Sequence, residues 1–142
     1  MECMIDHIVL NVEDDNEMVD FYSNVLQLAP LRLREYQAGE VPFPSIRLNS
    51  DTIIDLFPKK KWQKTARAGK GRESLNHFCL SMEKVEWDRL VKRLEVHNVD
   101  IEEGPVPRWG ARGTGTSIYF RDPEGNFIEA RYYEGFHDAK KC

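Results

Sequence analysis

The sequence predicts an α+β fold built from two copies of one module, each with the element order β-α-β-β-β. Residues 4–12 return seventy positions later as residues 74–82, with a histidine at the same place in each copy, His7 and His77. Each copy then continues through a polar break, an amphipathic stretch and a strand hairpin. Self-similarity at a fixed spacing is the signature of a repeated supersecondary unit.

The first strand and helix of the first module are predicted from two periodicities. Residues 5–12 alternate in the manner of a half-buried strand, and the alternation puts His7 on the face opposite the apolar residues. An apolar stripe at helical spacing follows, typical of a helix that packs on a sheet. The stripe consists of Met18, Phe21, Tyr22 and Val25. Asp14 and Asp15 precede it as candidate N-caps.

The rest of the first module is expected to form strands. Residues 31–37 and 45–48 are two of them, and residues 49–51 are the turn into a last strand at 52–57. In that last strand the flanking apolar residues take the helix side. Asp55 therefore lies on the other face of the sheet.

The second module repeats this order. Residues 75–82 alternate like the first strand, and an apolar stripe over residues 87–94 predicts a helix. A strand near Ile101 is expected to lead into a glycine-rich loop at 104–115. A hairpin then closes at the Asp-Pro-Glu-Gly sequence 122–125, a strong turn signal.

Four side chains with metal-ligand chemistry fall on the sheet faces that the helices leave free. They are His7 and Asp55 in the first module, and His77 and Glu129 in the second. Imidazole nitrogen and carboxylate oxygen suit Zn, Ni, Co, Mn and Fe(II). Any one of these residues alone is better explained as an ordinary strand residue. Two histidines and two acids at equivalent repeat positions favour a shared metal ion, with coordination positions left open for water or substrate.

Composition and charge limit the classes of function. A chain of 142 residues with 41% hydrophobic residues suits one compact domain. The net charge of −4 argues against a nucleic-acid partner. No apolar run is long enough to span a membrane and the first residues do not resemble a signal peptide. The three cysteines do not suggest a disulfide framework, so we expect a cytoplasmic protein.

We expect a single domain over residues 1–142, with module one at 4–58, a basic linker at 59–73 and module two at 74–134. The linker carries seven basic and no acidic residues between Lys59 and Arg72. Its ordinary interpretation is a solvated connector, and as a lid it would steer acidic substrates.

The glycine-rich loop contains candidate substrate-binding residues. They are Arg108, Trp109 and Arg112. Two guanidinium groups beside an indole are suited to a substrate carboxylate or phosphate. A mobile surface loop without such a role is an equally good interpretation.

The chain resembles the vicinal oxygen chelate superfamily, which includes glyoxalase I, extradiol dioxygenases, methylmalonyl-CoA epimerase, and fosfomycin- and bleomycin-resistance proteins. The resemblance covers nearly the whole chain and is most specific over residues 6–10, Phe21-Tyr22 and residues 117–129. Residues 102–108 look most like small single-domain glyoxalase-like proteins. The resemblance implies that the two modules form an eight-stranded open cup around one divalent metal ion, with helices on the outer face. It also implies a homodimer.

Three metal ligands are implied by the resemblance, namely His7, His77 and Glu129. The fourth family position is usually Glu, Gln or His, whereas here it is Asp55, which is one methylene shorter. Asp55 is therefore a direct ligand, a ligand through water, or a base. A metal with open positions chelates two adjacent oxygens of a small substrate and stabilises an enediolate, while Glu129 or Asp55 shuttles the proton. We expect isomerase or lyase chemistry similar to that of lactoylglutathione lyase.

Three alternatives remain open at this stage. Two histidines and one carboxylate also form the triad of Fe(II) oxygenases, which favours an extradiol-type dioxygenase as the runner-up. Thiol transfer to an antibiotic such as fosfomycin is less favoured, because Val9 stands where that family has a substrate-contacting threonine. A metal-free binding protein of the bleomycin-resistance type is disfavoured by the retained ligands.

Overall fold

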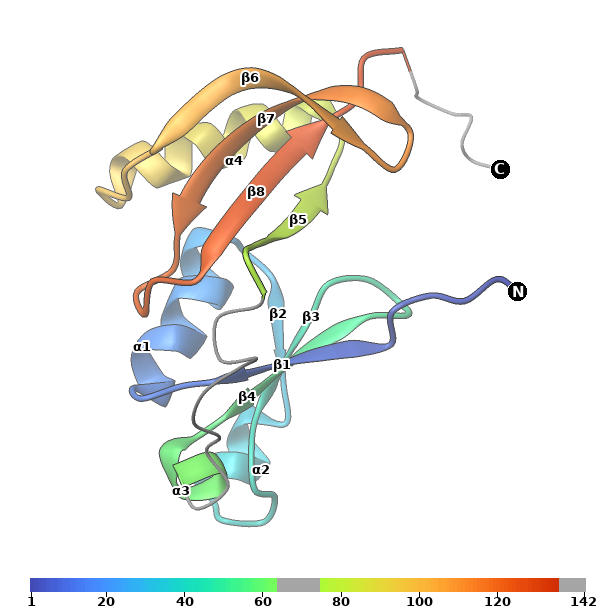
Figure 1. Ribbon diagram of the computed structural model, residues 1–142. Coiled ribbons are helices and arrows are strands. Elements are labelled where there is room, and N and C mark those ends of the chain that lie inside the picture. Colours follow the sequence, from blue (N-terminus) through green and yellow to red (C-terminus); the bar gives the residue numbers. More distant parts are fainter. Residues whose placement is uncertain (64–74, 136–142) are drawn as a thin grey trace. The chain divides into compact units, whose positions relative to one another are not determined.

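The computed structural model describes residues 1–63 and 75–135, and the chain divides into two compact units, residues 1–69 and 70–142. Each unit contains one open four-stranded sheet with helices (Figure 1). This confirms the predicted α+β fold of two β-α-β-β-β modules. None of the helices in the described residues has the length and apolarity that a membrane crossing requires.

The first unit has the strand order β1-β4-β3-β2. Its strands are β1 (His7–Asn11), β2 (Ala29–Leu31), β3 (Ser45–Arg47) and β4 (Ile53–Phe57). Its helices are α1 (Asp15–Asp20), which continues as the π-helical turn η1 (Phe21–Val25), then α2 (Leu33–Gln37) and α3 (Lys59–Trp62). β1 and β4 are parallel, and the other neighbours are antiparallel.

Helix α1 forms where the sequence predicts it. The Asp14 carboxylate accepts a hydrogen bond of 3.0 Å from the Glu17 backbone N–H, which satisfies one of the free donors at the helix start. The predicted apolar stripe is buried over α1 and η1. The opposite face of the sheet is therefore left for His7 and Asp55.

The strand predicted at residues 31–37 is wrong. Strand β2 ends at Leu31, because Arg32 adopts a left-handed conformation with φ of 58° that no strand continues through. Residues 33–37 then form α2. Leu, Arg, Glu and Gln are good helix formers, so local propensity decides this segment.

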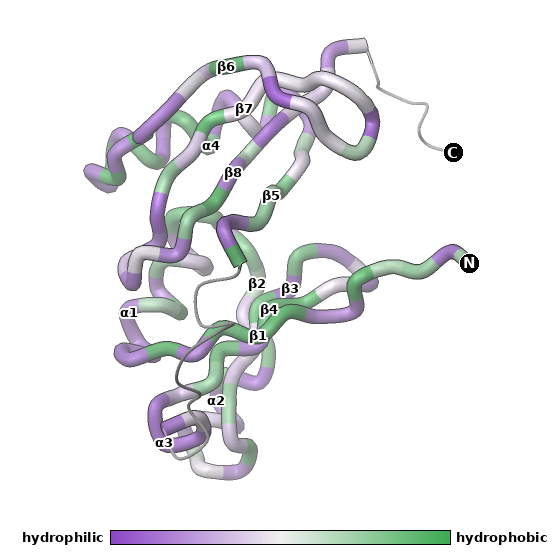
Figure 2. The backbone as a smooth tube through the Cα atoms, viewed as in Figure 1, coloured by the Kyte–Doolittle hydropathy of each residue, from purple (hydrophilic) through white to green (hydrophobic). Residues whose placement is uncertain are grey.

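The predicted basic linker also contains regular structure. Its first residues form α3, and the Trp62 indole N–H donates to the Val12 carbonyl at 3.1 Å. In Figure 2 this helix is hydrophilic, as expected of three consecutive lysines. Residues 64–73 of the predicted linker lie outside the described residues.

The second unit has the strand order β5-β8-β7-β6. Its strands are β5 (Phe78–Ser81), β6 (Glu103–Gly110), β7 (Gly113–Arg121) and β8 (Phe127–Tyr132), and its helix is α4 (Lys84–Val96). The apolar side of α4 is buried, and the Trp87 indole N–H donates to the Ala130 carbonyl at 2.9 Å. Since Ala130 follows Glu129 in β8, this contact fixes the helix against the strand that carries the predicted ligand.

The loop predicted at residues 104–115 is wrong, because β6 and β7 pair as a long antiparallel hairpin across this segment. Three of its glycines, Gly104, Gly110 and Gly115, mark close approach of chain segments rather than a loop. A Cβ on Gly115 would lie 2.7 Å from the Tyr132 carbonyl oxygen in the neighbouring strand. Such a position accepts only glycine without a local shift.

Candidate metal-binding site

The first unit brings His7 and Asp55 together. They lie on the parallel strands β1 and β4, where Asp55 pairs in register with Val9. The His7 Nε2 atom lies 4.0 Å from Asp55 Oδ2. Asp55 is buried, and its other oxygen, Oδ1, accepts a hydrogen bond of 2.6 Å from the Ser45 hydroxyl. One carboxylate oxygen is thus held by serine and the other faces the histidine.

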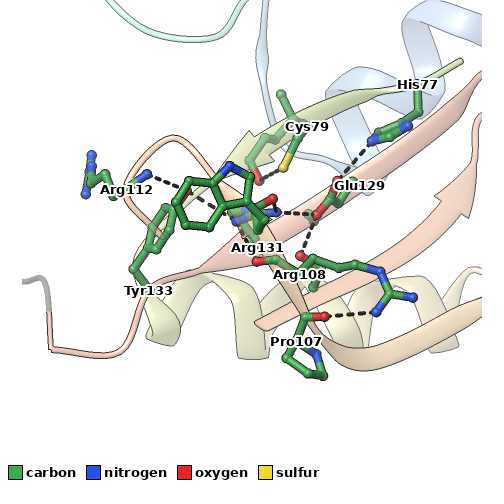
Figure 3. Close-up of polar contacts among 12 residues, drawn as sticks. His77, Cys79, Pro107, Arg108, Arg112, Glu129, Arg131 and Tyr133 are labelled. Carbon is green, nitrogen blue, oxygen red and sulfur yellow. Dashed lines mark hydrogen bonds and ion pairs between the residues drawn. The ribbon is translucent and has the colours of Figure 1, made fainter. Parts of the chain in front are cut away.

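The second unit brings His77 and Glu129 together in the same way. The His77 Nε2 atom lies 3.0 Å from Glu129 Oε1. The other carboxylate oxygen, Oε2, accepts hydrogen bonds from the Ser117 hydroxyl at 2.6 Å and from Arg131 Nη2 at 2.7 Å (Figure 3). Glu129 therefore has one oxygen fully engaged and one directed at the histidine.

Both histidines are oriented by the residue that precedes them. His7 Nδ1 lies 2.8 Å from Asp6 Oδ2, and His77 Nδ1 lies 2.7 Å from Asn76 Oδ1. Asp6 Oδ2 and Asn76 Oδ1 are acceptors, and they suit the tautomer that has its proton on Nδ1 and leaves Nε2 turned toward an acid. Metal-bound histidines are usually held in this manner by an outer acceptor. The bond to Asp6 also raises the pKa of His7.

The donor chemistry of His77 fits a cation between the histidine and the acid. A neutral imidazole has a single N–H, and His77 gives it to Asn76. In the tautomer whose Nδ1–H donates to Asn76, Nε2 is a lone-pair donor 3.0 Å from Glu129 Oε1, so both atoms are able to bind one positive ion. Ligand bonds of about 2.0–2.2 Å put neighbouring donor atoms about 3.0 Å apart in an octahedral site and about 3.4 Å apart in a tetrahedral one. The second pair meets that spacing.

The first pair does not meet that spacing, because its 4.0 Å separation is about 0.6–1 Å too long for neighbouring direct ligands. The shorter Asp55 side chain accounts for this difference. Among the described residues no three His, Cys, Asp or Glu side chains gather as a metal site. The candidate ligands come as two pairs, one in each unit.

Glu129 is held in its charged form. Burial alone would raise its pKa, but hydrogen bonds from Ser117 and Arg131, together with the Arg131 charge, outweigh burial and lower the pKa of this carboxyl. A carboxylate that stays ionised is suited to bind a metal ion.

The three predicted substrate-binding residues lie on the hairpin of β6 and β7. Arg108 forms an ion pair with Glu103 and lies 5.9 Å from the centre of the Tyr119 ring. Trp109 is 81% exposed. Arg112, in the turn, lines a pocket of about 240 Å³ together with Ser81, Met82, Glu83 and Tyr133. The segment is thus an ordered hairpin with two arginines and an exposed indole.

Sequence reasoning misses the residues that hold the acids. A sequence signal for Arg131 does exist, although Arg131 is not among the residues predicted from the sequence. Arg131 follows Glu129 by two positions in one strand, and alternation therefore places both side chains on the same face. Ser45 and Ser117 carry no comparable signal, since their positions beside the acids depend on strand register. Ser45 pairs directly with Asp55, whereas Ser117 pairs with Arg131 and reaches Glu129 diagonally.

Comparisons with known proteins agree with this architecture. The model of the Glyoxalase/Bleomycin resistance protein/Dioxygenase superfamily matches residues 4–130. Virulence protein STM3117 of Salmonella typhimurium is 31% identical over 130 residues, which are 91% of this chain and 83% of that protein. Its crystal structure matches with a TM-score of 0.72 and 27% identity, over 94% of this chain and 98% of that one.

Another relative has an activity in its name. Metallothiol transferase FosB of Shouchella clausii is 31% identical over 126 residues, which are 88% of this chain and 77% of that protein. Glyoxalase domain-containing protein RDO1 of Mycosarcoma maydis is 31% identical over 140 residues, or 96% and 70% of the two chains. The family match spans most of the sequence, and both modules lie within it. The chain belongs to the Glyoxalase/Bleomycin resistance protein/Dioxygenase superfamily.

Proposed function

We propose that this chain is a divalent-metal-dependent enzyme acting on a small molecule with two adjacent oxygen atoms, by isomerase or lyase chemistry of the glyoxalase kind. The observation that carries the proposal is the His77–Glu129 pair. Its donor atoms are 3.0 Å apart and its histidine is oriented from behind by Asn76. The proposed ligands are His7, His77 and Glu129, with Asp55 as the fourth group. The proposed functional unit is a homodimer.

The two acids have different surroundings, and we assign them different roles. Glu129 has Oε2 engaged by two donors, so only Oε1 is available and the residue is suited to be a fixed ligand. Asp55 accepts one hydrogen bond, from Ser45, and its Oδ2 has no hydrogen-bond donor among the described residues. Asp55 is therefore the better candidate for the base that moves a proton between adjacent carbons.

A divalent ion held by these residues would supply Lewis-acid stabilisation of the negative charge that develops on a substrate oxygen. The burial of Asp55 and Glu129 keeps water away from both carboxylates and strengthens their electrostatic interactions. Arg108, Trp109 and Arg112 are proposed to bind an anionic part of the substrate.

A second candidate function is thiol transfer, which the 31% identity to a metallothiol transferase favours. The same ligands would serve that chemistry, but Asp55 would not act as a base toward carbon. The two functions therefore differ in the substrates turned over and in the effect of replacing Asp55.

The test is metal analysis of protein purified without added metal, followed by assays on two substrate pairs. One is the adduct of methylglyoxal with glutathione, and the other is fosfomycin with a low-molecular-weight thiol. Asp55→Asn keeps the shape of the side chain and removes its charge. For isomerase chemistry we expect Asp55→Asn to abolish turnover of the first pair while metal affinity changes little.

Other outcomes overturn parts of the proposal. Turnover of fosfomycin alone would replace isomerase chemistry with thiol transfer. Bound iron with oxygen-dependent turnover of a catechol would establish the dioxygenase. A purified protein that takes up no divalent metal in stoichiometric amount would refute the metal site and favour a metal-free binding protein.

A further inference from the structure

We infer that Arg131 is a positioning residue that fixes Glu129 as a ligand through one oxygen and fastens the substrate-binding hairpin to it. The inference rests on the proposed function. Arg131 follows Glu129 by two residues in β8 and lies on the same face of the sheet. Its side chain is nearly fully buried, with 3% of its surface exposed. A buried guanidinium is costly unless its donors are satisfied.

The terminal nitrogens of Arg131 make four contacts, and Figure 3 shows the surroundings of this side chain. Nη2 donates to Glu129 Oε2 at 2.7 Å and to the Trp109 carbonyl at 2.9 Å. Nη1 donates to the Arg108 carbonyl at 3.2 Å and to the Tyr133 hydroxyl at 3.3 Å. All four terminal N–H groups therefore have partners, and only the Nε–H has no hydrogen-bond partner among the described residues.

These contacts decide which oxygen of Glu129 is free. Arg131 and Ser117 both donate to Oε2, while Oε1 is directed at His77. The first unit has no such arrangement, because Phe57 takes the position two residues after Asp55. The two carboxylates therefore differ in the number of donors that hold them. Arg131 supplies the additional donor that fixes Glu129.

The same guanidinium holds the hairpin that carries the proposed substrate-binding residues. It binds the backbone carbonyls of Arg108 and Trp109, and the Tyr133 hydroxyl that it contacts also accepts from the Arg112 backbone N–H at 3.3 Å. A movement of the hairpin therefore acts directly on the Glu129 carboxylate, since one side chain bonds both.

Glycine at position 110 is required for this connection. A Cβ there would lie 2.0 Å from Arg131 Nη1, a distance that no real contact has. The same Cβ would lie 2.6 Å from the Tyr133 hydroxyl, so Gly110→Ala would displace the guanidinium and its Tyr133 partner while keeping every polar group in the protein. Gly110→Ala therefore tests the displacement of the Arg131 guanidinium without replacing Arg131 itself.

The test compares Arg131→Met, Arg131→Lys and Gly110→Ala with the control Arg89→Met, which removes an exposed arginine from α4. Titration with Co²⁺ gives the metal affinity and the visible absorption spectrum of the bound ion. Hydrogen exchange of the metal-free protein reports the backbone amides of the hairpin. These readouts do not depend on activity.

We expect Arg131→Met and Gly110→Ala to weaken Co²⁺ binding about ten- to a hundredfold, as is common when an outer partner of a ligand is lost. Both substitutions should change the visible absorption spectrum of the bound Co²⁺ ion. Both should also speed hydrogen exchange of the backbone amides in residues 108–113. Arg131→Lys should recover part of the affinity, because it keeps one charged donor. Arg89→Met should resemble the wild type.

Unchanged Co²⁺ affinity and spectrum in folded Arg131→Met would overturn the inference while leaving the proposed function intact. A wild type that binds no Co²⁺ would refute the proposed function. In that case unchanged hairpin exchange in Arg131→Met would still overturn the anchoring role. If Arg131→Met fails to fold, Arg131→Lys and Gly110→Ala decide by the same criteria.

Discussion

Asp55→Glu tests whether one methylene accounts for the difference in spacing between the two histidine–acid pairs. His7 Nε2 and Asp55 Oδ2 are 4.0 Å apart, whereas the corresponding atoms of His77 and Glu129 are 3.0 Å apart. The difference is 1.0 Å. One added carbon–carbon bond extends a side chain by about 1.5 Å, which is enough to close this gap.

The substitution is expected to lower the stability of the metal-free protein and to raise its metal affinity. The longer side chain moves the carboxylate away from the Ser45 hydroxyl, which now lies 2.6 Å from Asp55 Oδ1. Loss of a hydrogen bond to a charged group should reduce the stability of the metal-free protein by about 1.5–3 kcal/mol. Metal affinity should rise roughly tenfold or more, since changes at outer partners of ligands already alter affinity by about 10–100-fold.

Calorimetric titration with Zn²⁺ and chemical denaturation of the metal-free protein measure both effects. Asp55→Asn is the matched control, because it keeps the length of the side chain and cannot gain a ligand. Weaker or unchanged Zn²⁺ binding by folded Asp55→Glu would refute the reasoning, since the added methylene would then bring no oxygen to the metal.

Three further substitutions test the contacts within each unit. Ser117→Ala removes a donor from the buried Glu129 carboxylate and should lower the free energy of unfolding by about 1–3 kcal/mol in urea denaturation. Asp14→Ala removes the N-cap of α1 and should cost about 0.5–2 kcal/mol by the same measurement. Burial and a hydrogen bond to Asp15 raise the pKa of Tyr36 from 10.0 to about 12. The stabilisation that Tyr36 gives over Tyr36→Phe should therefore be complete below pH 10 and disappear as the pH approaches 12.

Each of these has an outcome that contradicts it. Ser50→Ala is the control for Ser117→Ala, because Ser50 is exposed in a turn, and equal stability of the two variants would refute a role in holding Glu129. A wild-type stability for Asp14→Ala would contradict the capping role. A stability difference between Tyr36→Phe and wild type that stays constant from pH 9 to pH 12 would contradict the shifted pKa of Tyr36.

The sequence predicts those parts of the fold and site that depend on periodicity. Alternation places His7 opposite the helix-covered face, and the repeat places His77 in the equivalent position, because strand geometry fixes side-chain direction regardless of context. The helix stripes follow from the same kind of pattern. Each histidine therefore lies on the same side as the acid of its own module, at 4.0 Å in the first unit and 3.0 Å in the second.

Other parts depend on contacts that a single sequence does not display. Residues 31–37 are predicted as a strand, but Arg32 adopts a left-handed conformation. Strand β2 therefore ends before Arg32, and α2 begins after it. The glycines of residues 104–115 predict a loop, but Gly110 and Gly115 allow close approach of Arg131 and of the neighbouring strand. The importance of Arg131 itself depends on four partners, of which Arg108 and Trp109 are distant in the sequence and become visible only once the strands are paired.

Metal binding by the wild type and by His77→Ala tests the central claim most directly. Metal content is measured on protein purified without added metal, and divalent ions are then titrated into the metal-free form. His97→Ala is the control, because His97 is an exposed histidine at the end of α4. The wild type and His97→Ala should bind one divalent ion per chain tightly, and folded His77→Ala should lose this binding. Equal stoichiometry and affinity in His77→Ala would contradict the proposed metal site.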